Sequence, residues 1–392
     1  MAEFDILIYG ATGFTGSQLA KELHDQAPKG TRLALGGRNA EKLAKVAEPL
    51  GLPVVVADAM DKAAVDAMVK RASVVVTTAG PYAMYGDHVV DSCVAHGVHY
   101  LDITGETPWV RQVIDRHHES AKAQGTVVLP CCGFDSVPSD LGVLFMVKRV
   151  RERLDQGTKS VEAAFSIKGS FNGGTLASGL NIGEKFKAKD LANPFLLNPD
   201  PKTSREAWSA NADPKGPVTH AQLGSLAPFF MGPVNTRVVR RSAALLADSP
   251  QSYGPEFSYQ EYMRMGGTVS AWGATLAMGA MAAGMAKPAG RSLMARFGPK
   301  PGEGPSEADM DGGFVKVRYA ATAMDGQVLQ GQLKAPGDPG NRVTVRILAQ
   351  AALCVLEGED LPGGVLTPAV ALGQRLQDRL VATGKWEMKL LD

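Results

Sequence analysis

The chain has 392 residues, of which 45% are hydrophobic and 21% charged, and its 41 basic and 40 acidic residues leave a net charge of +1. This balance is typical of a globular protein and argues against nucleic acid as a partner. The four cysteines lack C-x-x-C spacing, so they favour neither a disulfide framework nor a zinc site, and we expect no metal. Because a strand is predicted from residue 4, we expect no signal peptide and a cytoplasmic setting.

The first 130 residues alternate between apolar runs and helical patterns. Apolar runs predict strands at residues 4–9, 32–35, 54–57, 74–77, 100–103 and 126–129. Amphipathic patterns predict helices at 40–50, 62–71, 87–96 and 108–124. Strands that are apolar throughout are buried on both faces, which indicates parallel strands covered by helices. The sequence therefore predicts an α/β fold with a Rossmann-type doubly wound parallel sheet.

A glycine turn follows the first strand and precedes a helix. Bound pyrophosphate needs backbone N–H donors at close range, and a Cβ atom would block that approach. Gly10 would make the tight turn, Gly13 would let the backbone approach the phosphates, and Gly16 would let the helix pack on the strand. The spacing is a weak signal alone, but its strand–turn–helix context predicts a dinucleotide site. We expect cofactor contacts from Gly10, Ala11, Thr12, Gly13, Phe14, Thr15 and Gly16.

The end of the second predicted strand bears on the choice of nucleotide. An acidic residue there accepts from the 2′-hydroxyl of NAD, whereas an arginine accommodates the 2′-phosphate of NADP. The strand ends at Gly37 with Arg38 next and no acid, which favours NADP, although Arg38 could instead start a solvated helix. The other residues that we expect along the cofactor are Asp58 near the adenine and, after the fourth strand, Ala79, Gly80, Pro81 and Tyr82.

The pattern changes beyond Pro138. A helix is predicted at 141–150, a strand at 160–167, and helices at 342–356 and 368–380. Residues 313–323 and 327–333 flank Asp325-Gly326, which predicts a β-hairpin. The polar stretches 187–220 and 299–313 are expected to be surface excursions. We therefore expect a Rossmann domain over 1–135, completed by 360–392, and an α+β mixed-sheet domain over 136–359.

Residues 265–286 contain no charged side chain and consist largely of Ala, Gly and Met. As a helix they would span about 33 Å, which is the length of a membrane span. Ala and Gly contribute little transfer free energy, however, so a true span is the least favoured interpretation. A helix packed in the fold is favoured first, and a membrane-surface or lipid-entry element second, since Met-rich surfaces adapt to flexible apolar partners.

The chain resembles the saccharopine dehydrogenase-like oxidoreductases, and within them the trans-acting enoyl reductases of long-chain polyketide lipid synthesis. The motifs that carry the resemblance are Gly10–Gly16, Leu35–Arg38, Ala79–Tyr82, Tyr100–Glu106, Cys132–Asp140, Asn172–Thr175 and Thr367–Gly373. The resemblance implies a Rossmann domain completed by the C-terminal helix and an inserted mixed-sheet domain. Family members without a known reaction exist, so the family alone leaves the chemistry open.

Reduction of an activated double bond needs a hydride donor, a group that polarises the carbonyl and a proton source. No tyrosine in the chain has a lysine four residues later, which excludes the short-chain dehydrogenase arrangement. The catalytic candidates that follow strand ends are Tyr82, Asp135 and Ser136, with Asp102 and Glu106 nearby. Asp135 would donate a proton only if burial raised its pKa. Helix capping or loop anchoring is the alternative for Asp102 and Asp135.

The expected activity is NADP(H)-dependent reduction of an enoyl bond in a long-chain acyl or polyketide lipid, free or carrier-bound. The alternatives are a saccharopine reductase-like amino-acid dehydrogenase and a lipid-associated nucleotide-binding protein without turnover. Arg237, Arg240 and Arg241 form the clearest basic cluster of the second domain, and a solvated face is the expected interpretation. Peripheral membrane contact through 265–286 is a further expectation, and the oligomeric state stays open.

Overall fold

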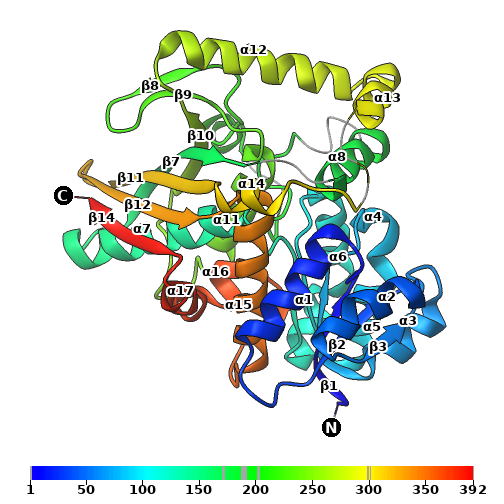
Figure 1. Cartoon of the computed structure of the whole chain (residues 1–392). Coiled ribbons are helices and arrows are strands. Elements are labelled where there is room, and N and C mark those ends of the chain that lie inside the picture. The colour runs from blue at the N-terminus through cyan, green and yellow to red at the C-terminus, as the bar shows by residue number, and fades with distance from the viewer. Residues whose placement is uncertain are drawn as a thin grey trace.

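The computed structural model describes residues 2–169, 173–186, 192–200, 204–297, 300 and 302–391. Within these residues the chain forms two seven-stranded sheets, A and B, with helices around both (Figure 1). Parts of the expected surface stretches, at 187–191, 201–203, 299 and 301, lie outside the described residues, as do Gly298 and Asn172. The described part of 187–220 holds a short helix, α10 (Arg205–Ala210), and a strand, β8 (Val218–His220).

Sheet A is parallel throughout, as predicted, with the strand order β13-β6-β5-β4-β1-β2-β3. Its strands are β1 (Phe4–Tyr9), β2 (Leu33–Gly37), β3 (Val54–Val56), β4 (Ala72–Thr77), β5 (His99–Asp102), β6 (Val127–Leu129) and β13 (Gly364–Val365). The expectation that every strand is buried on both faces was wrong for β3. This strand lies at the sheet edge, where Val54 and Val56 are exposed.

Two cores cover the two faces of sheet A, because successive side chains of a strand point to opposite faces. Ile6 and Ile8 of β1 join the core beneath α1 (Phe14–Gln26) and α15 (Thr344–Leu356), which lie side by side in Figure 1. Leu7 and Tyr9 join the core on the opposite face. The helices packed there are α3 (Lys62–Val69), α5 (Asp87–His96) and α6 (Thr107–Gln124).

Sheet B is mixed, with the order β14-β12-β11-β7-β10-β9-β8, and β7 and β10 are its parallel pair. Its remaining strands are β7 (Thr158–Lys168), β9 (Gly224–Pro228), β10 (Ser258–Arg264), β11 (Phe314–Ala323), β12 (Val328–Pro336) and β14 (Glu387–Leu391). The predicted hairpin is confirmed, because β11 and β12 pair from Phe314–Pro336 to Thr322–Val328 around the Asp325-Gly326 turn. One face of the sheet packs on α7 (Val137–Leu154), where the Tyr319 hydroxyl donates to the Pro138 carbonyl over 2.8 Å.

The remaining helical segments connect or flank the two sheets. They are α2 (Ala40–Ala47), η1 (Glu48–Leu50), α4 (Tyr82–Tyr85), α8 (Gly173–Lys185), α11 (Gly232–Leu245), α12 (Thr268–Met285), α13 (Pro288–Phe297), α14 (Glu307–Asp311), η2 (Pro339–Val343), α16 (Pro368–Ala371) and α17 (Gly373–Ala382). The single helix expected at 368–380 was wrong, because the chain breaks at Leu372 into α16 and α17, and Gly373 has a φ of +45°.

The chain passes between the two sheets more than once after residue 336. Helix α15 packs on sheet A, and β13 pairs with β6 at the edge of the same sheet. Strand β14 then pairs with β12 in sheet B. Residues 344–365 therefore contribute to the first sheet, and 387–391 contribute to the second.

The uncharged stretch 265–286 forms α12, and its placement differs from the favoured expectation. Of the helix residues only Ala271 is buried, so α12 is not a core helix. It crosses the top of the molecule in Figure 1, where it touches β9 and α13. Among the described residues no single helix is long and apolar enough to cross a membrane. Helices α12 and α13 meet that length and composition only as a pair bent by 108°.

Candidate functional site

The glycine turn lies between β1 and α1 at the carboxyl edge of sheet A. Gly10 has a φ of +85°, and a Cβ at Gly16 would lie 2.2 Å from the Gly10 carbonyl oxygen, so both positions require glycine. A Cβ at Gly13 would meet only that same oxygen, at 3.3 Å. No side chain caps the N-terminus of α1 at Gly13. An uncapped helix N-terminus beside bare backbone fits the pyrophosphate of a dinucleotide.

The residues around this turn form its walls. Ala11 is fully buried in the core of sheet A, whereas Thr12, Phe14 and Thr15 are partly exposed. The ring of Phe14 lies against Gly304, where a Cβ would come within 2.3 Å of it. The segment around residue 304 therefore crosses the start of α1, and its contact with Phe14 closes one side of the turn.

The adenosine end of the expected site lies at the ends of β2 and β3. The Arg38 side chain is exposed, and Asn39 beside it caps α2 by accepting from the Lys42 amide over 2.9 Å. The Asp58 carboxylate accepts from the Met60 amide over 2.9 Å. Burial, with the Asp58 charge, raises the pKa of Tyr9 to about 12, and Arg38 acts in the opposite direction. Arg38 and Asp58 therefore flank one edge. No hydrogen bond or ion pair to the Arg38 guanidinium is found among the described residues, so this group fits a 2′-phosphate.

The opposite end of the site is a loop of small residues after β4. The Ala79 amide donates to the Thr77 hydroxyl over 3.2 Å, and Gly80 and Pro81 lead into α4. Glu106 anchors this loop, because its carboxylate accepts from the amides of Tyr82 at 2.8 Å and Ala83 at 3.0 Å. The loop geometry thus depends on a buried carboxylate that sequence reasoning had named only as a neighbour.

Helix α8 covers the same loop. Its Asn181 amide donates to Glu106 over 3.3 Å, and its Lys185 ammonium donates to the Ala83 carbonyl over 2.8 Å. Sequence reasoning missed both residues, since they lie in a glycine-rich stretch without a charge pattern that points to Glu106. The side of the site where we expect the nicotinamide is therefore built jointly by the loop after β4 and α8.

Tyr82 does not face the open edge of the sheet. Its hydroxyl donates to the Thr77 carbonyl over 3.1 Å, and its ring packs on Trp109 with the centroids 5.8 Å apart. Burial raises the pKa of Tyr82 well above its usual range, and the charge of Asp102 adds to the effect. A buried phenol that donates to backbone is a packing residue, so we do not assign it the proton transfer.

Asp135 and Ser136 lie between β6 and α7 and differ in their surroundings. The Asp135 side chain is partly exposed, and no hydrogen bond to its carboxylate is found among the described residues. Burial raises its pKa to about 6. The Ser136 hydroxyl is fully buried and donates to the Asn235 amide oxygen over 3.3 Å. The Asp135 carboxyl is thus half protonated only near pH 6 and has no hydrogen-bond donor among the described residues, whereas the Ser136 hydroxyl is already hydrogen-bonded.

A buried polar network continues from Ser136 to α11 and β10. The Asn235 amide donates to Glu261 over 2.7 Å, and the hydroxyls of Ser139 and Tyr259 donate to the same carboxylate at 2.7 and 2.8 Å. Burial raises the pKa of Glu261 to about 7, against these hydrogen bonds. Sequence reasoning missed the network, because its members come from three separate elements. It joins α7, α11 and β10 beneath the site.

The expectation of a solvated basic face on α11 was wrong. Arg237, Arg240 and Arg241 are at most 2% exposed. Arg240 donates to the carbonyls of Pro194 and Tyr259 at 3.0 and 2.8 Å, and Arg241 donates to the carbonyls of Leu197 and Val365. Arg237 pairs with Asp213. Chain segments between residues 192 and 213 cover the helix, so its guanidinium groups tie loops together and do not face solvent.

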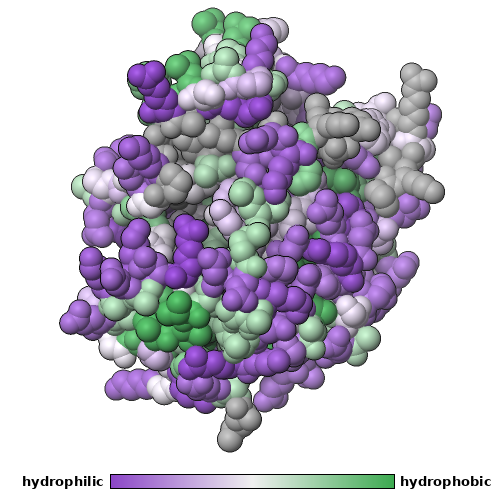
Figure 2. Space-filling view, turned by 90° about the vertical axis from the view of Figure 1, so that its right-hand side faces the viewer, coloured by the Kyte–Doolittle hydropathy of each residue, from purple (hydrophilic) through white to green (hydrophobic). Residues whose placement is uncertain are grey.

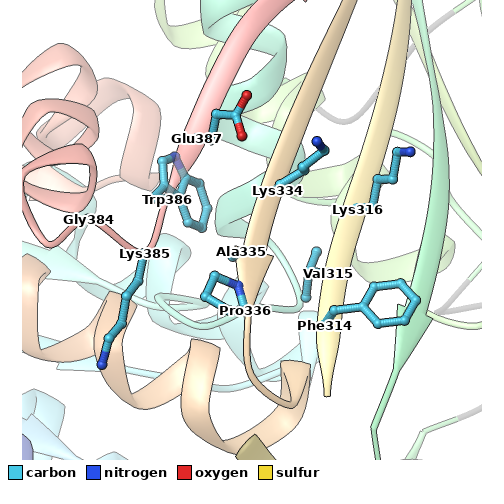
Figure 3. A pocket seen from close by; sticks show the side chains of 10 residues that line it. All are labelled: Phe314, Val315, Lys316, Lys334, Ala335, Pro336, Gly384, Lys385, Trp386 and Glu387. Atoms are coloured by element: carbon cyan, nitrogen blue, oxygen red, sulfur yellow. The ribbon is translucent and has the colours of Figure 1, made fainter. Parts of the chain in front are cut away.

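A groove of about 450 Å³ lies elsewhere, on sheet B beside the loop that precedes β14 (Figure 3). Lys316 and Lys334 project from neighbouring strands along it, and Trp386 forms its opposite wall. None of the residues predicted to contact cofactor lines this groove. Within the part of the chain that the structure describes, no group of three or more His, Cys, Asp or Glu side chains is placed to hold a metal ion.

Comparisons with known proteins agree with this geometry. The saccharopine dehydrogenase NADP-binding domain family matches residues 6–129, which contain the glycine turn. Among solved structures, saccharopine dehydrogenase (L-Glu forming) from Saccharomyces cerevisiae matches with a TM-score of 0.58 at 13% identity, over 99% of this chain and 100% of that one. Homospermidine synthase from Legionella pneumophila, in complex with NAD, gives a TM-score of 0.55 at 11% identity, over 100% and 92%. These likenesses show the fold.

Sequence relatives carry the comparison further. A Mycobacterium tuberculosis protein provisionally named a trans-acting enoyl reductase is 38% identical, over 97% of this chain and 96% of its own length. The trans-acting enoyl reductase of Mycobacterium ulcerans is 34% identical over the same shares, and that of Mycobacterium leprae is also 34% identical. The chain therefore belongs to the trans-acting enoyl reductase family of saccharopine dehydrogenase-like proteins, and it is an oxidoreductase that uses NADP.

Proposed function

We propose that this chain reduces the activated carbon–carbon double bond of a long-chain acyl or polyketide lipid intermediate. The names of its relatives support an enoyl substrate, at 32–38% identity over 97% of the chain. The observation that carries the proposal is the burial of the arginines of α11. Each of these guanidinium groups is already bonded to protein oxygens.

This observation distinguishes the proposal from the amino-acid alternative. A saccharopine-like substrate carries several carboxylates and needs free arginines or lysines to bind them. Arg240 and Arg241 are buried, and burial lowers the pKa of each to about 9. Guanidinium groups that are hydrogen-bonded to backbone carbonyls cannot also bind the carboxylates of a substrate. An uncharged acyl group does not need free arginines or lysines, so it is the substrate class that this part of the protein favours.

The reaction needs a hydride at the β-carbon and a proton at the α-carbon of the enoyl group. NADPH held at the glycine turn of Gly10, Gly13 and Gly16 would supply the hydride. We assign the proton to Asp135, whose raised pKa and free carboxyl suit a general acid that is recharged from solvent. The carboxyl loses its proton to the α-carbon, the double bond becomes a single bond, and water returns the proton.

The test uses purified protein, NADPH and a long-chain trans-2-enoyl thioester, with NADPH oxidation followed by absorbance. We expect turnover with the thioester and none with saccharopine and NADP⁺. Asp135→Asn should lower kcat by roughly 100- to 10,000-fold and leave NADPH binding unchanged. The matched control is Asp325→Asn, which neutralises an exposed carboxylate in the hairpin turn far along sheet B.

Three results would contradict the proposal. Oxidation of saccharopine would favour the amino-acid dehydrogenase. Tight NADPH binding without turnover on any acyl thioester would favour a nucleotide-binding protein without catalysis. Full activity in Asp135→Asn would remove the assigned proton donor while leaving the substrate class in place.

A further inference from the structure

Helix α12 exposes large apolar side chains without a partner from the described chain. Val269 is 88% exposed, Leu276 68% and Trp272 54%. Residues at positions i, i+3 and i+7 of a helix share one face, so these three form a single stripe. The opposite side, with Ala271, touches β9. A helix that is apolar all round is ordinarily buried, so the exposed stripe indicates a surface that binds a partner.

The next helix repeats the pattern. On α13, Leu293 and Phe297 are 60% and 77% exposed and lie four residues apart, which places them on one face. Both helices lie along the same end of the molecule in Figure 1, and Figure 2 shows hydrophobic side chains gathered at that end above hydrophilic ones. The 108° bend between the helices spreads the two stripes over a broad surface, not along one line.

The charge of this segment is one-sided. Residues 262–302 contain no aspartate or glutamate, whereas they contain five cations, Arg264, Lys287, Arg291, Arg296 and Lys300. Lys287 and Arg296 are exposed, and neither has an ion pair among the described residues. Arg291 donates to the Met285 carbonyl over 3.0 Å and so closes the end of α12. Apolar stripes bordered by unpaired cations are complementary to a surface that is apolar inside and anionic at its rim.

We propose that α12 and α13 dock this protein on the surface of an anionic lipid membrane. The stripe of α12 and the Leu293–Phe297 face lie at the boundary between headgroups and acyl chains, and Lys287 and Arg296 contact lipid phosphates. A second copy of the chain fits less well. A symmetric pairing through this segment would oppose its cations with the same cations, and the segment has no acid to neutralise them.

The docking segment lies next to the site. Helix α13 packs against α8, and α8 holds the loop after β4 through Asn181 and Lys185. A membrane-bound α12–α13 surface would therefore present acyl chains beside the nicotinamide end of the cofactor site. This consequence rests on the proposed function, whereas the docking itself does not.

The test is flotation of the purified full-length protein with vesicles of phosphatidylcholine alone or mixed equally with phosphatidylglycerol. We expect binding to the anionic vesicles, weaker binding to the neutral ones and loss of binding at high salt. Leu276→Asp should lower the partition coefficient more than about tenfold. Val381→Asp, a like change at an exposed position of α17, should leave it unchanged. Lys287→Gln with Arg296→Gln should lower binding to anionic vesicles roughly fivefold for each charge.

NADPH titration checks that each variant is folded, and if Leu276→Asp fails this check, the double glutamine variant decides. Vesicles should also shift the fluorescence of Trp272, and Trp272→Phe should abolish the shift. No vesicle binding by the wild type would overturn the proposal, as would equal binding by the variants. A dimer that Leu276→Asp dissociates, without vesicle binding, would assign the surface to a second copy. Vesicle binding by a protein without reductase activity would keep the docking and reject only the proposed function.

Discussion

Gly13 and Gly16 of the first turn have separable roles, and single alanine substitutions test them. In Gly13→Ala the new Cβ lies 3.3 Å from the Gly10 oxygen, and the local backbone is extended at a φ of −75°. The contact is tight but needs a shift of only a few tenths of an ångström, so the free energy of unfolding should change by no more than about 1 kcal/mol. The methyl group blocks the approach of the phosphates, however, and the loss of one charge-assisted hydrogen bond weakens NADPH binding roughly 10- to 100-fold.

Gly16→Ala should affect mainly the stability of the fold, whereas Gly13→Ala should affect mainly NADPH binding. Its Cβ would lie 2.2 Å from the Gly10 oxygen and 2.7 Å from the Thr78 hydroxyl, about 1 Å inside ordinary contact, so α1 must move off β1. We expect a loss of stability of roughly 1–3 kcal/mol or more. Gly216→Ala is the control, since nothing lies within 4 Å of its Cβ. Chemical denaturation and NADPH titration separate the effects, and wild-type NADPH affinity in Gly13→Ala would refute the assigned phosphate position.

Three further predictions address single side chains. Arg38→Ala should weaken NADPH binding about tenfold or more and leave NADH binding unchanged, and equal affinities in the wild type would contradict the 2′-phosphate contact. Tyr82→Phe should keep enoyl turnover and should lower the free energy of unfolding by about 1 kcal/mol, because the hydrogen bond to the Thr77 carbonyl is lost. Loss of turnover in this variant would instead indicate that Tyr82 is a proton donor. Burial raises the pKa of Asp140 to about 7 from 3.8, so the folded state binds its proton more tightly than the unfolded chain. The free energy of unfolding therefore falls between about pH 4 and 7, and Asp140→Asn should flatten that slope in denaturation experiments across this range.

The sequence predicted best what is decided locally. The first strand was predicted at residues 4–9 and forms there, because an apolar run, a turn and a helix start follow each other within thirteen residues. The hairpin of sheet B is a similar case, since its turn carries Asp325 and Gly326. Both predictions rest on backbone preferences that neighbouring residues determine.

Features that depend on distant parts of the chain could not be predicted from the local sequence. Val54–Val56 reads as a buried strand, and only the strand order places it at an edge. Arg237, Arg240 and Arg241 repeat at i, i+3 and i+4, which is the pattern of a solvated helix face. They are buried because segments that lie earlier in the chain cover them, and for Arg240 and Arg241 residues 29 to 46 positions earlier supply oxygen acceptors. The sequence of α11 alone does not indicate that these segments cover the helix.

The sequence could not single out Asp135 among the buried carboxyls, but the hydrogen bonds in the structure distinguish it from the others. Burial raises the pKa of Asp102, Asp140 and Glu261 to about 7, close to the value of about 6 for Asp135. The first three accept two or more hydrogen bonds each from fixed donors, so a change of protonation would disturb the packing around them. Among the residues that the structure describes, no donor holds the carboxylate of Asp135. A general acid must lose and regain its proton in every turnover, and of these four carboxyls we therefore propose Asp135 as the proton donor.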